Sequence, residues 1–358
     1  MISRYEGDRP LPVLMIPLRR CGSHALRLRL NFSRDFYSPY PLHLVDFVPL
    51  LPLYGDLSED RNYFQLVVDV VGLQAVSMVK WPDAVFDPVE IFEALAGQPR
   101  SVHRIAWELL FRAGERQGAR VVMDKSLDNV HYADELLQLF PQMRFLNVVR
   151  DPRAQVASIN RAIIHDFDTA LNLKTWVAAY QAADHLLTRY PDKVLTIRYE
   201  DFLQDQERAL RQICDFFGLV FLPQMLDIRS SAEAAQIANL SALWSSNYFP
   251  PIAAHADKFR QQLSMREIEL IETACQDYMQ RYGYTMMTPA QLPLSDELLA
   301  SALERSRSAR EQAWRDLKTN NYRDYILRRG RADYLENLSR RLQRDAQGEG
   351  LTQSTAVE

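Results

Sequence analysis

The chain has 358 residues, of which 47% are hydrophobic and 25% are charged, and its formal net charge is −4. This composition supplies one large core, and so mild a charge gives no reason to expect nucleic acid or another polyanion as a partner. The three cysteines, which have no C-x-x-C spacing, argue against a disulfide framework and a structural zinc site. No apolar leader and no apolar run of membrane length is found, so we expect a cytoplasmic protein without a membrane span.

The first predicted element is a buried parallel strand over the apolar residues 13–16, which Pro17 ends. A basic turn from Arg19 to His24 follows, and residues 25–30 begin a helix. A strand, a glycine-containing turn and a helix start form an anion site, because free backbone N–H groups and the helix dipole point at the ligand. Gly22 lets the backbone curl inward, and Arg20 adds a fixed positive charge.

Residues 36–55 are rich in Phe, Tyr, Pro and Leu, and two readings compete for them. One is a strand from Leu42 to Phe47 followed by a loop that prolines break. The other is a cap over a pocket. Beyond this stretch we predict a helix that starts near residue 61, one from Pro88 to Ala96, and one that Ser101 caps and that ends near Gln117.

Three further buried strands alternate with helices in the next hundred residues. The strands are expected at 119–123, 145–149 and 194–197, and the helices at 132–140, 154–164, 171–190 and 207–217. Such alternation implies crossover connections, and therefore an α/β fold with a central parallel sheet covered by helices on both faces. Ligands of such sheets bind beyond the carboxyl ends of the strands, where charged residues follow all four predicted strands.

The C-terminal part of the sequence is helical and rich in arginine. We expect helices over 264–282 and 295–317, then a basic stretch with interspersed tyrosines. The domain organisation that we predict is a main domain over 1–290, a helical C-terminal extension over 291–345 and a disordered tail over 346–358.

A second anion site is predicted at the end of the third buried strand. Arg150 ends that strand, and Ser158 lies eight residues further on, inside the next helix. We expect the arginine, the start of the helix and the serine hydroxyl to form an anion pocket beside the first one.

These strings together resemble the sulfotransferase family in order and spacing over residues 12–285. FLNVVRDPRAQVASINR is similar to the family's 3′-phosphate motif, and the turn Arg20–His24 is a degenerate form of its R-S-G-T-T turn. Asp124-Lys125-Ser126 stands where the family has D-K-T-P, and residues 197–202 resemble its Y-E-D-L segment. The resemblance implies a P-loop-like α/β fold, 3′-phosphoadenosine-5′-phosphosulfate (PAPS) as donor, adenosine 3′,5′-bisphosphate (PAP) as product, and an acceptor hydroxyl.

The resemblance also implies residue roles. The 5′-phosphosulfate would be held by the turn residues Arg20, Cys21, Gly22, Ser23 and His24. Arg150 and Ser158 would hold the 3′-phosphate, and Tyr199 would line the adenine. Lys258 and Arg260 are candidates for a basic loop over the 3′-phosphate, with ordinary surface charge as the favoured reading.

Sulfuryl transfer needs a cation at the oxygen that leaves and a base for the acceptor hydroxyl. Arg20 and Lys125 are the candidate cations. The two places where relatives carry the base are occupied here by Leu127 and Pro41. His43, two residues beyond Pro41 and on the same face if the chain is extended, is our first candidate base. His24 is the second and Asp46 the third.

Two other functions stay open at this point. Asp124 after an apolar strand resembles the Walker B aspartate of a P-loop small-molecule kinase, which would hold Mg²⁺ there. The altered phosphate turn also fits a non-catalytic nucleotide-binding protein. We favour a sulfotransferase that needs no metal and acts on a small molecule. The aromatic stretch 36–54 suggests an apolar acceptor, although such stretches are more often plain core. No oligomeric state is predicted.

Overall fold

Five parallel strands form the sheet in the computed structural model, which describes residues 9–241, 244–249 and 257–347. The spatial order is β2-β3-β1-β4-β5, with β1 Leu11–Ile16, β2 Phe36–Tyr37, β3 Val121–Asp124, β4 Arg144–Val149 and β5 Val194–Arg198. The four predicted strands and the parallel α/β fold are confirmed. The edge strand β2 was not predicted, because two residues carry no periodic signal.

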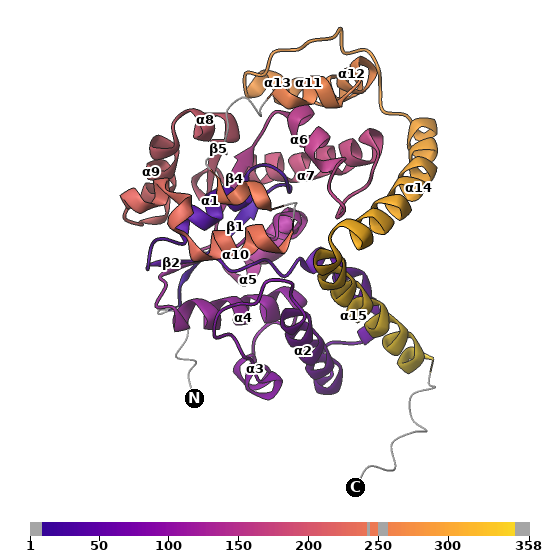
Figure 1. Ribbon diagram of the computed structural model, residues 1–358. Helices are drawn as coiled ribbons and strands as arrows, with labels where there is room; N and C mark the ends of the chain where they lie inside the picture. Colours follow the sequence, from indigo (N-terminus) through magenta and orange to yellow (C-terminus); the bar gives the residue numbers. More distant parts are fainter. Residues whose placement is uncertain (1–8, 242–243, 250–256, 348–358) are drawn as a thin grey trace.

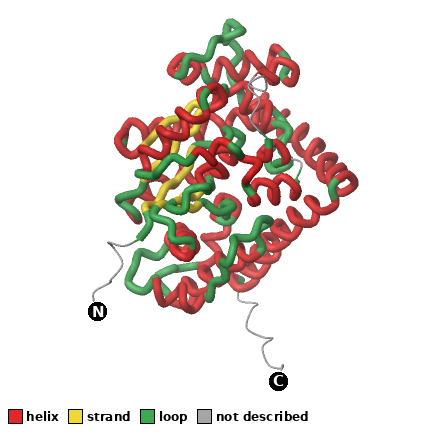
Figure 2. Tube along the Cα trace, turned by 60° about the vertical axis from the view of Figure 1, so that its left-hand side comes forward, coloured by secondary structure: helices red, strands yellow, loops and turns green. Residues whose placement is uncertain are grey.

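Helices lie around the strands (Figure 2) and pack on both faces of the sheet. They are α1 Ser23–Leu30, α2 Asp60–Ala75, α3 Pro88–Ala94, α4 Val102–Arg116, α5 Ala133–Leu139, α6 Pro152–Ile159, α7 Thr169–Arg189, α8 Tyr199–Gln204, α9 Gln206–Phe217, α10 Ala232–Leu240, α11 Phe259–Gln262, α12 Met265–Ala274, α13 Gln276–Arg281, α14 Asp296–Asn320 and α15 Tyr322–Ala346. Within the described residues, no helix combines the length and the apolar character that a bilayer crossing requires.

The side chains of β1 alternate between two cores, one on each face of the sheet. Leu14 and Ile16 belong to a large core with α2, α4 and α7, whereas Val13 and Met15 belong to a smaller core with α1 and α9. Because successive side chains of a strand point to opposite faces, a strand buried on both faces must be apolar throughout, as this one is.

The strand register brings four loops to one edge of the sheet. Leu14 of β1 pairs with Asp124 at the end of β3, and Val149 at the end of β4 pairs with Arg198 at the end of β5. From β1 the chain forms β2 and β3 on one side of β1 and then β4 and β5 on the other, so the topological switch point of the sheet lies beside β1. Crevices of this kind bind ligands in open α/β sheets.

The strand expected from Leu42 to Phe47 is wrong. Those residues contain a 3₁₀ helix, Leu44–Asp46, and a second one follows at Val48–Tyr54. Four prolines between residues 39 and 52 lack the N–H groups that a strand ladder needs. The competing reading, a cap over a pocket, agrees better with the structure.

Two predicted helices also differ from the observed ones. The helix expected over 154–164 starts earlier and ends at Ile159, where the Asn160 side chain hydrogen-bonds to Thr169 and Asn172 at the start of α7. The helix expected over 264–282 is interrupted at Cys275, whose backbone leaves the helical region. The predicted tail lies outside the described residues from 348 onward, and its first residue, Ala346, still belongs to α15.

The extension α14–α15 runs along one side of the molecule, and α15 lies beside α2 (Figure 1). Tyr334 of α15 donates a hydrogen bond to the backbone carbonyl of Asp69, and Arg341 forms an ion pair with the Asp69 carboxylate. Gly72 makes this approach possible, because a Cβ atom there would lie 2.3 Å from the Tyr334 hydroxyl. The boundary between main domain and extension at residue 290 stays a prediction.

Candidate active site

The turn after β1 has the backbone conformation of an anion site. Gly22, the N-cap of α1, has φ +92°, and a Cβ atom there would lie 2.2 Å from Cδ2 of Tyr199. A side chain is therefore excluded both by backbone strain and by the tyrosine ring. Arg20 also adopts a positive φ, 69°. No acidic residue occupies the first turn of α1, so its N-terminal N–H groups face no carboxylate from their own turn.

One hydrogen-bonded chain joins the two anion sites that the sequence predicts separately. Arg20 donates from Nε to the Ser158 hydroxyl over 3.0 Å, and Arg150 donates from Nη1 to the backbone carbonyl of Arg20 over 2.7 Å. The Arg150 guanidinium also lies 5.0 Å from the centre of the Tyr199 ring. These four residues come from the ends of β1, β4 and β5 and from α6, and they form a single constellation.

One N–H group at the start of α6 is already bound within the protein, and a contribution of this helix start to the second anion site stays a prediction. Asp151 caps this helix by accepting the N–H of Arg153. Arg153 in turn is clamped between the buried carboxylates of Asp151 and Glu272, at 2.6 Å from each. In the string R-D-P-R only the first arginine faces the cavity. The second ties α6 to α12.

Lys125 follows β3 and is almost completely buried, with 2% of its surface exposed. Burial, together with the positive charge of Arg27, lowers the pKa of Lys125 to about 7. Within the described residues its ammonium group makes no hydrogen bond or ion pair. A buried ammonium without a partner is costly, and an anionic ligand would remove that cost.

Like Lys125, Arg20 and Arg150 have no acidic partner among the described residues. Among the described residues, no carboxylate lies within ion-pairing distance of any of the three. Burial and the neighbouring Arg150 guanidinium lower the pKa of Arg20 to about 10. Three cations that line one cavity and have no ion-pair partner in the described part of the chain make the site electrostatically complementary to an anion that carries several charges.

Two histidines, His24 and His43, line the cavity together with these cations, and each packs against the Tyr40 ring. The ring centroids are 6.1 Å apart for His24 and Tyr40 and 5.8 Å apart for Tyr40 and His43. Burial lowers the pKa of both imidazoles well below the usual value, with Lys125 adding to the effect at His24 and Arg19 at His43. Both rings are therefore neutral at pH 7. In each, Nδ1 is buried and has no hydrogen-bond partner among the described residues.

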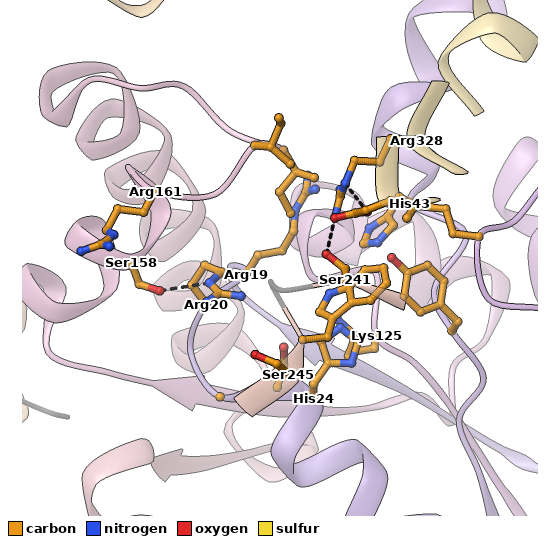
Figure 3. A pocket seen from close by; sticks show the side chains of 18 of the residues that line it. Arg19, Arg20, His24, His43, Lys125, Ser158, Arg161, Ser241, Ser245 and Arg328 are labelled. Atoms are coloured by element: carbon orange, nitrogen blue, oxygen red, sulfur yellow. Dashed lines mark hydrogen bonds and ion pairs between the residues drawn. The ribbon is translucent and has the colours of Figure 1, made fainter. Parts of the chain in front are cut away.

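Figure 3 shows the cavity of about 1230 Å³ that these groups share. The predicted residues that line it are Arg20, Gly22, Ser23, His24, His43, Asp46, Lys125, Arg150, Ser158 and Tyr199. The Cys21 side chain is instead fully buried in the smaller core, so only the backbone of Cys21 could bind a ligand. Of the two weaker candidates, Lys258 lines the cavity, whereas Arg260 forms an exposed pair with Asp257.

Several lining residues were not predicted. Tyr40 comes from the stretch 36–54, and Trp244 packs against it with ring centroids 5.5 Å apart. Arg19 belongs to the basic turn, which could have pointed to it. Side chains from α14 and α15 form a further wall, for which the sequence gives no signal because the contact joins segments more than a hundred residues apart.

Asp124, the aspartate that suggested a kinase, is committed to its own turn. Its two carboxylate oxygens accept from the Ser126 N–H over 2.8 Å and from the Asn129 side chain over 3.1 Å. It does not line the cavity. In the part of the chain that the structure describes, no group of three or more His, Cys, Asp or Glu side chains could bind a metal ion.

A sequence profile of the sulfotransferase family matches residues 12–223, more than half of the chain. The chain belongs to the sulfotransferase family. This stretch contains the residues that we predicted for the family's anion sites from the turn after β1 to Tyr199, but not the two weaker candidates Lys258 and Arg260. The helices α14 and α15 lie outside the matched residues.

Solved sulfotransferase domains share the fold of this family member. The sulfotransferase domain from the Synechococcus PCC 7002 olefin synthase is 23% identical over 79% of this chain and 98% of its own, with a TM-score of 0.54. The sulfotransferase domain from the curacin biosynthetic pathway is 18% identical over 78% of this chain and 100% of its own, with a TM-score of 0.52. The expected sulfotransferase fold is thus confirmed.

Proposed function

We propose that the protein transfers a sulfuryl group from PAPS to the hydroxyl of a small-molecule acceptor, with PAP as the second product. The observation that carries this proposal is a group of three cations, Arg20, Lys125 and Arg150, that have no ion-pair partner among the described residues and lie at the switch point of the sheet. Family membership supports transferase chemistry of this kind, and the cation group fits a donor with several negative charges at two separated positions.

The residues present fit the two anionic ends of such a donor. The turn Arg20–His24 offers backbone N–H groups and a guanidinium to the 5′-phosphosulfate. Arg150 and the Ser158 hydroxyl would take the 3′-phosphate, and the Arg20–Ser158 hydrogen bond would open to make room for it. Tyr199 would offer its ring to the adenine. These assignments stay proposals.

The donor supplies the sulfuryl group, and the protein has to manage the charges that its transfer creates. Lys125 and Arg20 would stabilise the negative charge that develops on the phosphate oxygen. His43, which lines the cavity, would accept the proton of the attacking hydroxyl on its neutral imidazole. An anion among the cations around His43 offsets their charge and raises the pKa of the imidazole toward the neutral range.

The acceptor is proposed to be a small molecule with a hydroxyl group, and the cytoplasmic location stays a prediction. The kinase reading is weakened by the engagement of both Asp124 oxygens. Nothing specific supports a non-catalytic role, because Lys125 and the candidate bases all line the cavity.

The proposal is tested by incubating the protein with PAPS that carries a sulfur-35 label and with a panel of alcohols and phenols. We expect labelled sulfate ester and an equal amount of PAP, and loss of both in Lys125→Ala. Parallel incubation with γ-labelled ATP and Mg²⁺ tests the kinase. Transfer of phosphate in that reaction, with none of sulfate in the first, would overturn the proposal.

A further inference from the structure

The cavity is larger than the donor alone requires. Sites for one small molecule usually measure about 300–1,000 Å³, against about 1230 Å³ here. The part beyond His43 is closed by the extension: Arg331 on α15 donates a hydrogen bond to the His43 carbonyl. Apolar side chains face the cavity from this extension, namely Trp314, Leu317, Ala332 and Leu335.

The arginines of this wall differ from those around the donor turn, because each has a carboxylate of its own. Arg328 pairs with Asp324 at 2.8 Å, and these two side chains are nearly completely buried. The other pairs are Arg331–Asp46 at 3.1 Å and Arg310–Asp166 at 2.7 Å. An anionic acceptor would have to displace one of these carboxylates, and a cationic one would approach a guanidinium that is already present.

Three other cations from outside the extension line the cavity, and one of them, Arg19, pairs with Asp128 at 2.9 Å. The other two are Arg161 and Lys258. Arg161 lies beside Ser158 (Figure 3). Lys258 immediately precedes α11, which packs against α6 through Phe259 and Arg153. Neither adds charge to the wall that α14 and α15 form. That wall therefore offers matched ion pairs and half-buried apolar surface.

We infer that the extension forms the acceptor site and that the acceptor is a neutral alcohol with an apolar body. Trp314, Leu317 and Leu335 contact that body and determine specificity. This inference takes the reaction from the proposed function. Binding of the alcohol to the wall does not depend on which reaction the protein catalyses, so it can be measured separately. Burying apolar surface favours binding by about fourfold for each added methylene group.

The test uses three alcohols of matched length: 1-hexanol, 6-hydroxyhexanoate and 6-amino-1-hexanol. Their binding to the PAP-saturated protein is measured by ligand-detected NMR titration. We expect 1-hexanol to bind at least about tenfold more tightly than either charged alcohol, and 1-octanol to bind more tightly still. Tighter or equal binding of 6-hydroxyhexanoate would overturn the inference. PAP binding is measured first, and its failure would count against the proposed function alone, since the alcohols can be titrated without PAP.

A pair of variants on α14 places the site. Leu317→Lys puts an unmatched cation on the wall, and should weaken 1-hexanol and strengthen 6-hydroxyhexanoate, each by about tenfold. Leu303→Lys makes the same change on the same helix at a side chain that is 58% exposed and does not line the cavity. It should leave both affinities unchanged. If Leu317→Lys and Leu303→Lys behave alike, α14 does not form the acceptor site.

Discussion

The guanidinium of Arg331 on α15 donates a hydrogen bond to the backbone carbonyl of His43 over 3.1 Å, across 288 residues of sequence. The same guanidinium forms an ion pair with Asp46. His43 has a positive φ of 53°, a conformation that a residue with a side chain seldom adopts. The Ser126 hydroxyl accepts the His43 N–H over 3.3 Å from the other side. The extension therefore helps to fix the candidate base.

We expect Arg331→Gln to lower turnover by about ten- to a hundredfold, because a small displacement of a catalytic group is costly. PAP affinity should stay unchanged, since the contacts of Arg331 are with residues 43 and 46 and not with the donor turn. Arg329→Gln is the matched control, because Arg329 is exposed on the same helix and pairs with Asp333. Equal turnover of the two variants would show that Arg331 does not position His43.

The role of His43 is tested by the variant that removes it. His43→Ala should lower turnover by at least about a hundredfold, the low end of the contribution of a positioned base. PAP affinity should not change. His24→Ala should instead weaken donor binding, because His24 lies in the first turn of α1. If His43→Ala retains near-normal turnover, the assignment is wrong and His24 becomes the first alternative.

Binding of the 3′-phosphate is assigned to Arg150. Arg150→Ala should weaken PAP binding by about ten- to a hundredfold, through loss of a charge-assisted contact. AMP has no 3′-phosphate, and its affinity should change little. Titration of both nucleotides measures the two effects separately. A parallel loss for AMP would mean that Arg150 acts only by supporting the Arg20 carbonyl, to which it also donates.

The lowered pKa of Lys125 predicts how PAP affinity depends on pH. Below pH 7 the ammonium is charged in the free protein, so binding takes up no proton there. Above pH 7 the free protein has lost this proton, whereas the bound anion raises the pKa, so binding must restore it. PAP affinity should then fall by up to about tenfold per pH unit.

Calorimetric titration between pH 7 and 9 checks this dependence. The phosphate groups of PAP ionise near pH 6 and contribute little in that range. Lys125→Arg keeps its charge at every pH and should flatten the profile. A wild-type profile as flat as that of Lys125→Arg would contradict the pKa shift.

The sequence predicts the parts of this protein in which neighbouring residues carry the signal. The strand over 145–149 and Arg150 after it are both found, because a buried apolar run followed by a charge is a local pattern. The alternation of apolar and polar residues over 42–47 suggested a strand. The prolines around this segment prevent the backbone pairing that a strand needs, so the pattern alone was misleading. His43 nevertheless lines the cavity, for a reason unrelated to the strand that suggested it.

Contacts between segments that are far apart in the chain could not be predicted from the sequence. Arg20 and Ser158 were assigned to different anion sites, and only the folded structure reveals the hydrogen bond between them. Likewise, Arg153 belongs to the same motif as Arg150. It forms an ion pair with the buried Glu272, which comes from a helix that begins more than a hundred residues later. The wall from α14 and α15 is the largest such omission.

The central claim is that two metal-independent anion pockets bind one nucleotide, and calorimetric titration with PAP in the presence of EDTA tests it most directly. We expect PAP to bind at least about tenfold more tightly than AMP, the value of one charge-assisted phosphate contact. ATP with Mg²⁺, titrated without EDTA, should bind more weakly than PAP. Equal affinities for PAP and AMP, or tight ATP binding that requires Mg²⁺, would contradict the claim.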